Sequence, residues 1–247
     1  MSTSIYNLSV FKTIDGLNNA AAAFIMDVAQ EAIAARGRFS IALSGGQTPA
    51  GMYKVLASSP YKTALPWKNI SIFWGDERCV PLDDERNNAY QAKNILLDEI
   101  EIPATNIHRI QTNLQPEQAA MIYEKEITSF FNGAQQRYDL ILLGLGENGH
   151  TASIFPGTDI INEKLEGVRA VYVTEEKKYR VSMTAPLINK AHQILFLVTG
   201  ISKAAVMKNV LTGAYQPAIL PAQLIKPITG KLNWFTDEGA ASFLQNK

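Results

Sequence analysis

The chain has 247 residues, 47% of them hydrophobic and 19% charged, a composition that predicts a large buried core and argues against disorder. Its 23 lysines and arginines balance 23 aspartates and glutamates, so no global field gathers polyanions, and we expect no nucleic-acid partner and no membrane-surface partner. Cys79 is the only cysteine, which excludes an internal disulfide, and no cluster of cysteines and histidines indicates zinc.

The first half of the chain alternates strand-like apolar runs with amphipathic stretches of helix length. Residues 1–16 are polar and mixed, without the basic start and apolar run of a secretory signal, so we expect a cytoplasmic protein. The predicted elements are a helix over 20–36 with Asn19 as N-cap, a strand over 39–43, a helix to residue 57 with Thr48 as N-cap, a strand over 70–74 and a helix over 87–97.

The second half continues the same alternation. It predicts a short strand over 107–110, a helix over 116–131, a buried strand over 140–143, strands over 170–173 and 194–198, a helix over 201–211 and a late strand over 232–235. Such an order predicts βαβ units and a mostly parallel sheet. In open α/β sheets ligands bind at the carboxyl ends of strands, so polar residues just after strands are the candidates for a site.

The first candidate is the turn formed by Ser44, Gly45, Gly46, Gln47 and Thr48, between a predicted strand and a predicted helix. Glycines let the backbone approach a ligand closely, and the N–H groups of a helix N-terminus attract anions. The segment is therefore either a phosphate-binding loop or a tight turn without a ligand. It matches neither the dinucleotide fingerprint nor the Walker A pattern, so nucleotide binding is not indicated.

Ser44 also permits a different interpretation. The sequence around it nearly matches the G-x-S-x-G pattern of serine hydrolases, except that Ala42 replaces the first glycine. The order Ser44, Asp76, His150 would allow a catalytic triad. A phosphate ligand explains Ser44 equally well, and we favour that interpretation.

The acidic and basic cluster of Asp76, Glu77 and Arg78 follows the predicted strand that ends at Trp74. A cluster of this kind is usually a solvated loop. Its place at a strand end favours a functional role only modestly.

His150 is the strongest single candidate. It ends the glycine-rich segment GLGENGH, residues 144–150, which follows a buried strand. A neutral imidazole at such a position can activate water near neutral pH. The other two histidines, His108 and His192, lie in contexts that favour structural roles.

Arg180 and Lys203 are each ordinary surface residues by default, but both lie at the ends of predicted elements. Together they could complete a phosphate site, since arginine offers a planar fork of donors and lysine a point charge.

Taken together, the segments resemble the 6-phosphogluconolactonase family over most of the chain, from about residue 39 to residue 241. The matching segments are LSGGQTP at 43–49, WGDER at 74–78, NN at 87–88, LGLGENGHTASIFPG at 143–157, RVSMT at 180–184 and GISKA at 200–204. Several ordered motifs in one chain are far more specific than any one of them.

The resemblance implies one three-layer α/β domain over residues 1–247, a mostly parallel sheet flanked by helices, Rossmann-like and similar to glucosamine-6-phosphate deaminases. It implies no cofactor, no metal, and a sugar phosphate lactone as substrate. His150 would be the general base and Arg78 a substrate-orienting or charge-stabilising residue. The substrate- and phosphate-binding set would be Ser44, Gly45, Gly46, Gln47, Thr48, Asp76, Asn148, Gly149, Arg180 and Lys203. The oligomeric state would be a monomer or a small homo-oligomer.

Two alternatives remain beside the lactonase. Deaminases of the related family usually continue from the histidine with Ile-Ala-Phe-Asn-Glu-Pro, whereas this chain continues with TASIFP at 151–156 and lacks that acidic residue. A non-catalytic sugar-phosphate sensor is the second alternative. One departure concerns Asn148, because both families commonly carry Asp two residues before the histidine.

Overall fold

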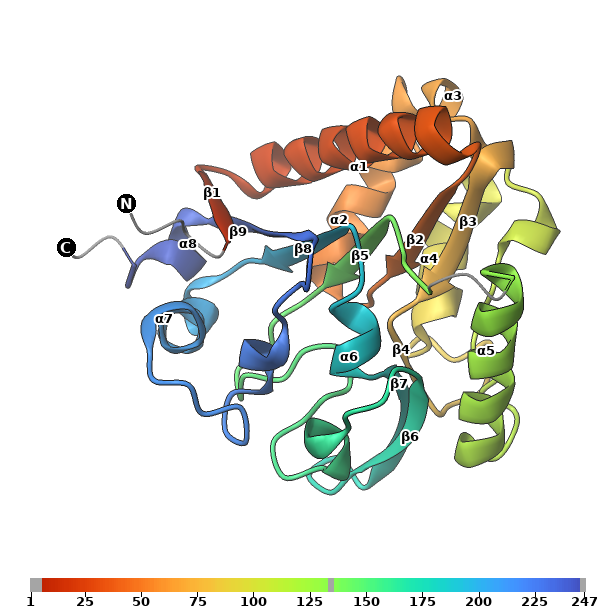
Figure 1. Cartoon of the computed structure of the whole chain (residues 1–247). Coiled ribbons are helices and arrows are strands. Elements are labelled where there is room, and N and C mark those ends of the chain that lie inside the picture. The colour runs from red at the N-terminus through yellow and green to blue at the C-terminus, as the bar shows by residue number, and fades with distance from the viewer. Residues whose placement is uncertain (1–5, 133–135, 245–247) are drawn as a thin grey trace.

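The computed structural model describes residues 6–132 and 136–244 (Figure 1). Its central feature is a six-stranded sheet in the order β1-β9-β8-β5-β2-β3, in which every neighbouring pair runs parallel. The strands are β1 (Asn7–Phe11), β2 (Phe39–Leu43), β3 (Ile70–Trp74), β5 (Leu140–Leu143), β8 (Gln193–Val198) and β9 (Lys231–Asp237). The predicted mostly parallel sheet is therefore confirmed.

The three strands β2, β3 and β5 have the bounds that the sequence predicts. Every residue of these strands is buried. Strands covered on both faces read as continuous apolar runs, which is why the sequence marks them so clearly. Their carboxyl ends, at Leu43, Trp74 and Leu143, therefore lie along one edge of the sheet, since neighbouring strands run parallel.

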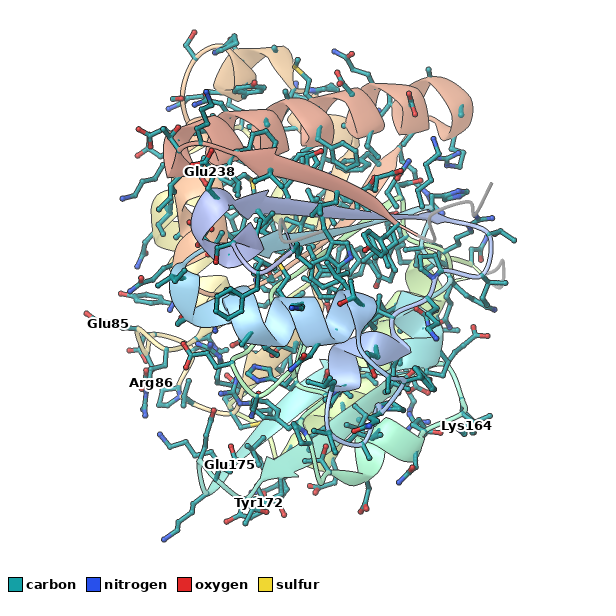
Figure 2. The ribbon with its side chains drawn as sticks, turned by 90° about the vertical axis from the view of Figure 1, so that its left-hand side faces the viewer. Glu85, Arg86, Lys164, Tyr172, Glu175 and Glu238 are labelled. Atoms are coloured by element: carbon teal, nitrogen blue, oxygen red, sulfur yellow. The ribbon has the colours of Figure 1, made fainter. Side chains whose placement is uncertain are left out.

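Helices cover both faces of this sheet. In Figure 1, α1 (Ile14–Arg36) runs above the sheet, and α6 (Ala185–Ile188) and α7 (Ala204–Thr212) lie below it. The remaining helices are α2 (Gln47–Leu56), α3 (Tyr61–Ala64), α4 (Asn88–Ile95), α5 (Pro116–Phe130) and α8 (Glu238–Ala241). Figure 2 shows side chains filling the space between the layers, whereas charged residues such as Glu85 and Lys164 project outward. None of the described helices is long and apolar enough to cross a membrane.

A second, three-stranded antiparallel sheet was not predicted. It has the order β4-β7-β6, with β4 (Asp76–Arg78), β7 (Lys178–Met183) and β6 (Val168–Val173). In its register Asp76 faces Ser182 and Arg78 faces Arg180. This sheet brings two segments together that are about a hundred residues apart in the chain, and it sets both arginines side by side.

Two predicted helix starts are wrong for identifiable reasons. The first helix begins at Ile14 rather than residue 20, because the hydroxyl of Thr13, not Asn19, accepts the N–H of Gly16 at 3.0 Å. Thr48 is not an N-cap: α2 begins at Gln47, after Gly46, whose φ of 111° is open mainly to glycine. The hydroxyl of Thr48 instead lies 2.7 Å from that of Thr199.

The predicted strand over 107–110 is also wrong, since only Ile107 forms a single bridge, to Ile72. The helix predicted over 201–211 starts as a 3₁₀ turn, Ile201–Lys203, before α7. The other 3₁₀ turns are Trp67–Asn69, Leu97–Glu99, Ala104–Asn106, Asp159–Asn162 and Pro221–Leu224.

Candidate active site

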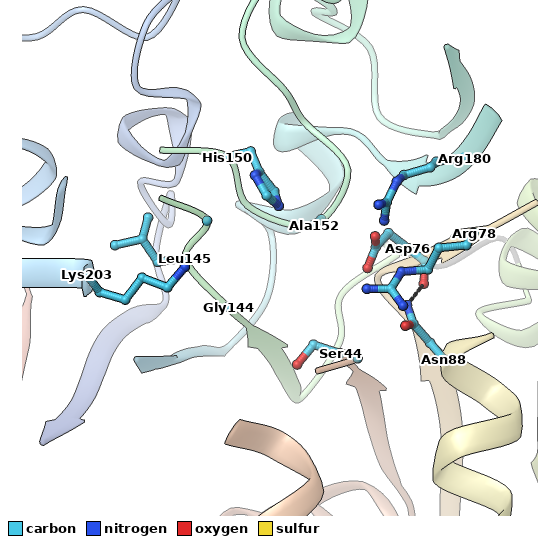
Figure 3. A pocket seen from close by; sticks show the side chains of 12 residues that line it. Ser44, Asp76, Arg78, Asn88, Gly144, Leu145, His150, Ala152, Arg180 and Lys203 are labelled. Atoms are coloured by element: carbon cyan, nitrogen blue, oxygen red, sulfur yellow. Dashed lines mark hydrogen bonds between the residues drawn. The ribbon is translucent and has the colours of Figure 1, made fainter. Parts of the chain in front are cut away.

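A pocket of about 230 Å³ opens at the carboxyl edge of the sheet, where β2, β3 and β5 end (Figure 3). Seven of the residues predicted for the site line it: Ser44, Gly45, Asp76, Arg78, His150, Arg180 and Lys203. Five further lining residues were not in the predicted set: Asn88, Gly144, Leu145, Gly146 and Ala152. The structure thus gathers strand ends that are far apart in sequence.

Five predicted residues do not line this pocket: Gly46, Gln47, Thr48, Asn148 and Gly149. Gly46 and Gln47 begin α2, immediately behind the lining residues Ser44 and Gly45. Gly149 packs on a different segment, since its carbonyl accepts the N–H of Ala222 at 2.9 Å. Of this group, Asn148 acts on the pocket indirectly.

The side chain of Asn148 fixes the orientation of the His150 ring. Its Oδ1 lies 2.6 Å from Nδ1 of the imidazole and accepts the backbone N–H of His150 at 3.3 Å. A backbone N–H can only donate, so the atom facing it is the amide oxygen. The same oxygen then accepts a hydrogen bond from the protonated Nδ1, which leaves Nε2 unprotonated in the neutral ring. The structure therefore supplies a histidine with a free basic nitrogen.

The surroundings of the ring keep it neutral. His150 stacks on Phe155, with ring centroids 3.9 Å apart and an angle of 17° between planes. A Cβ on Gly146 would overlap the imidazole, so only glycine allows the loop to pass this close. Burial, partly opposed by the negative charge of Asp76, lowers the pKa of His150 to about 4. The ring is thus a free base at neutral pH.

Asp76 is buried and tied to structure rather than to the histidine. Its Oδ2 accepts the hydroxyl of Ser153 at 2.6 Å, and the backbone N–H of Ser153 donates to Ser182 at 3.1 Å. Asp76 therefore holds the chain just after His150 against the small antiparallel sheet.

Glu77 is the functional neighbour whose role sequence reasoning missed. It is 1% exposed, and its carboxylate accepts backbone N–H groups from Arg78 at 2.8 Å, Asn88 at 2.7 Å and Ala89 at 2.9 Å. Burial raises the pKa of Glu77 to about 7, although these three donors oppose the shift. Glu77 thus joins β4 to the N-terminus of α4, the two elements that present Arg78 and Asn88 to the pocket.

Three cationic side chains face the pocket. Figure 3 shows Arg78 and Arg180 on one side of the His150 ring and Lys203 on the other. Arg180 is 8% exposed, donates to Glu176 at 2.7 Å and lies 5.3 Å from the ring centroid of Phe155. Arg78 donates from Nη1 to the carbonyl of Arg86 at 2.7 Å, and Lys203 lies 3.8 Å from Glu147. Arg180 is thus paired with Glu176, whereas Arg78 has no carboxylate partner among the described residues and Lys203 has only the longer contact with Glu147. These two cations leave the pocket able to attract an anion.

Several buried polar atoms of the lining have no hydrogen-bond partner in the described part of the chain. They are Oγ of Ser44, Oδ1 of Asn88, Nε of Arg78 and Nε of Arg180. Buried polar groups in proteins are nearly always paired, so an unpaired group at a pocket wall points to a ligand. The available sequence signal for Asn88 was the Asn87-Asn88 pair. Asn87 caps α4 by accepting the N–H of Tyr90, and this places Asn88 in the first turn of that helix.

Within the described ranges, 6–132 and 136–244, no group of three His, Cys, Asp or Glu side chains could hold a metal ion. The lining itself offers a neutral imidazole beside three cations. Such an arrangement can take a proton from water and stabilise negative charge on an oxygen.

Comparison with known proteins finds relatives over most of the chain. Residues 12–234 match the family described as glucosamine-6-phosphate isomerases/6-phosphogluconolactonase. The 6-phosphogluconolactonase of Synechocystis sp. is 42% identical over 220 residues, which cover 87% of this chain and 88% of the relative. The structure of the Trypanosoma brucei 6-phosphogluconolactonase superposes with a TM-score of 0.85 at 28% identity, covering 97% of this chain and 98% of that one. A monomeric glucosamine-6-phosphate deaminase, at 23% identity with 96% and 99% coverage, shares the fold with a TM-score of 0.83.

Proposed function

The chain belongs to the glucosamine-6-phosphate isomerase/6-phosphogluconolactonase family, and from that premise we propose that its pocket is a lactonase site. The enzyme hydrolyses 6-phospho-D-glucono-1,5-lactone to 6-phospho-D-gluconate, a step of the pentose phosphate pathway. The observation that carries the site assignment is the hydrogen bond from His150 to Asn148, because it leaves Nε2 free in a pocket lined by cations.

His150 is the general base in this proposal. A δ-lactone is an activated ester, so one base and one positioned water are sufficient for its hydrolysis. Nε2 takes a proton from the water as the water oxygen attacks the lactone carbonyl. The imidazolium then returns that proton to the ring oxygen as the C–O bond breaks. The lowered pKa of His150 keeps the base form present throughout the neutral range.

The cations have two tasks. As the water attacks, negative charge develops on the carbonyl oxygen, and we assign its stabilisation to Arg78, with backbone N–H groups; one such donor contributes roughly 3–4 kcal/mol. The phosphate is assigned to Arg180, Lys203 and, from the loop of residues 44–48, to Ser44 and Gly45, which line the pocket. Binding energy from this remote group orients the lactone for attack. Asp76, which also lines the pocket, and Gly149 hold the loop that carries His150, through Ser153 and Ala222 respectively.

A deaminase or isomerase is the alternative activity to consider first, because a glucosamine-6-phosphate deaminase has the same fold. The position of Phe155 argues against it. Phe155 stacks on the imidazole, in the segment where the deaminase pattern continues toward an acidic residue. Release of ammonia from glucosamine 6-phosphate would favour the deaminase.

The hydrogen bonds also disfavour a serine esterase. Asp76 pairs with Ser153, the Nδ1 of His150 pairs with Asn148, and Oγ of Ser44 has no partner among the described residues. A triad needs an acid on the histidine and the histidine on the serine. Labelling of Ser44 by a fluorophosphonate probe would favour the esterase instead.

We further propose that residues 1–247 form one domain that works in the cytosol as a monomer or small homo-oligomer, with no nucleic-acid partner. One hydrophobic core that extends from Leu17 to Ala240 supports the single domain. The formal net charge of zero supports the absence of a polyanionic partner.

The test of the function generates the lactone in situ from glucose 6-phosphate and follows acid release against the spontaneous rate. A lactonase accelerates acid release at catalytic enzyme concentrations. A sensor binds 6-phosphogluconate in calorimetry and leaves the spontaneous rate unchanged.

A further inference from the structure

A second charged pocket lies at the opposite edge of the six-stranded sheet, at the amino ends of β5, β8 and β9. Its volume is about 330 Å³, and α1 forms one wall. Four basic side chains line it: Arg36 in the last turn of α1, Arg137 before β5, His192 before β8 and Lys231 at the start of β9. The pocket therefore gathers basic groups from four segments of the chain.

One of these cations is already neutralised. Arg36 donates from Nε and Nη2 to Oδ1 of Asp139 at 3.1 and 2.6 Å. The other oxygen of Asp139 accepts the backbone N–H and the hydroxyl of Ser40 at 2.7 and 2.8 Å. Asp139 is thus fully committed. The remaining acid of the lining, Glu31, is exposed on α1 and forms no ion pair within the part of the chain that the structure describes.

The other three basic groups have no acceptor among the described residues. Among residues 6–132 and 136–244, the side chains of Arg137, Lys231 and His192 form no hydrogen bond or ion pair, and Nε of Arg137 is buried without a partner. Burial first, and then the charges of Arg137 and Arg36, hold the pKa of His192 below its ordinary value. The imidazole is therefore neutral and close to both guanidinium groups.

We propose that this pocket binds a phosphate dianion, either free or carried by a small metabolite. Arg137 and Lys231 are the two uncommitted cations of the lining, and they outweigh the single unpaired acid, the exposed Glu31, so the pocket keeps positive charge for an anion. A guanidinium, an ammonium and an imidazole from three separate segments line the pocket, and donors of these kinds bind phosphate oxygens. The proposal goes beyond the lactonase assignment and holds whether or not that assignment is correct, because the two pockets lie at opposite ends of the strands.

The histidines provide a local readout. The chain has three of them, so their Cε1–H signals in NMR spectra can each be assigned from a His→Gln variant. The probes are inorganic phosphate and glucose 6-phosphate, added near neutral pH at constant ionic strength. We expect the His192 signal to move saturably with either probe while His108 stays in place. His150 reports separately on binding in the catalytic pocket.

The variants decide the site. Arg137→Ala is expected to lower the affinity for phosphate, measured from the shift of the His192 signal, roughly tenfold or more. Lys231→Ala changes an exposed residue and gives the same test if the first variant does not fold. Lys208→Ala removes an exposed lysine of α7 outside the pocket and should leave binding unchanged. Tighter binding of glucose 6-phosphate than of phosphate supports an esterified ligand, and equal binding supports free phosphate. An unmoved His192 signal, or equal binding by wild type and both pocket variants, overturns the proposal.

Discussion

Asn148 holds His150 through a 2.6 Å contact between its Oδ1 and Nδ1 of the imidazole. Related families commonly carry Asp at this position, and the amide keeps the hydrogen bond without adding a charge. Two properties of the site follow from this contact. It fixes the tautomer, and it leaves burial as the largest influence on the pKa of His150.

We predict that Asn148→Asp raises the pKa of His150 above its present value of about 4. A carboxylate at this distance favours the imidazolium, so less free base is present at mildly acidic pH. Since the base form exists only above the pKa, the acid limb of kcat/KM should move to higher pH. The measurement is a pH–rate profile of wild type and variant. An acid limb that stays in place would show that position 148 does not influence the base.

We predict that Glu77→Gln lowers kcat/KM, by up to about 100-fold, although Glu77 does not line the pocket. The amide cannot accept all three backbone N–H groups, so Arg78 and Asn88 lose their fixed positions. Stability should fall as well, by about 1–3 kcal/mol.

Two controls separate positioning from general destabilisation. Glu163 also accepts backbone N–H groups, from Lys164 at 2.9 Å and Leu165 at 3.0 Å, but lies outside the pocket. Glu163→Gln should leave kcat/KM unchanged. In an Arg78→Ala background, Glu77→Gln should cost less activity than it does alone. Fully additive losses would mean that Glu77 does not act through Arg78.

Arg180→Ala and Lys203→Ala should weaken binding of the phosphorylated lactone far more than binding of the unphosphorylated lactone. Both cations face the pocket, and the loss of a charged hydrogen-bond partner commonly costs about 1.5–3 kcal/mol. The KM values of the two lactones provide the comparison. Arg169→Ala is a matched control, because Arg169 pairs with Glu163 and Glu124 away from the pocket. Equal losses for both lactones would give Arg180 and Lys203 a structural role only.

Exhaustive chelation should leave the activity intact. The proposed steps need only a neutral imidazole, a water molecule and the cations of the pocket. Activity is measured after dialysis against a chelator and again after metal addition. Inactivation that a single metal reverses would require a different mechanism.

The sequence predicted the parallel sheet well, but of the small antiparallel sheet it predicted only the strand over 170–173, which lies in β6, for a physical reason. Strands β2, β3 and β5 are buried on both faces and read as apolar runs. In contrast, β4 consists of Asp76, Glu77 and Arg78, whose charges resemble a loop, and its pairing with β7 is a long-range contact. The edge strand β1 was missed because its residues 7–11 are mostly exposed.

In the site, too, local sequence patterns could be predicted and long-range or side-chain contacts could not. His150 was found because it ends a glycine-rich segment that follows a predicted strand, and Arg78 and Lys203 because they lie near the ends of predicted elements. All three line one pocket. The contact of Asn148 with the imidazole and the three donors on Glu77 depend on side-chain geometry that no local pattern encodes. Thr48 was expected in the site as a helix cap, yet it lies inside α2.

The most direct test of the account is the lactone hydrolysis rate of His150→Ala, measured against the spontaneous reaction. We predict a loss of about 10²–10⁴-fold in the enzyme-catalysed rate, because the variant has no general base. Binding of 6-phosphogluconate should remain close to that of wild type, since the cations that hold it are unchanged. Turnover near the wild-type rate would contradict the assignment of His150 as the base.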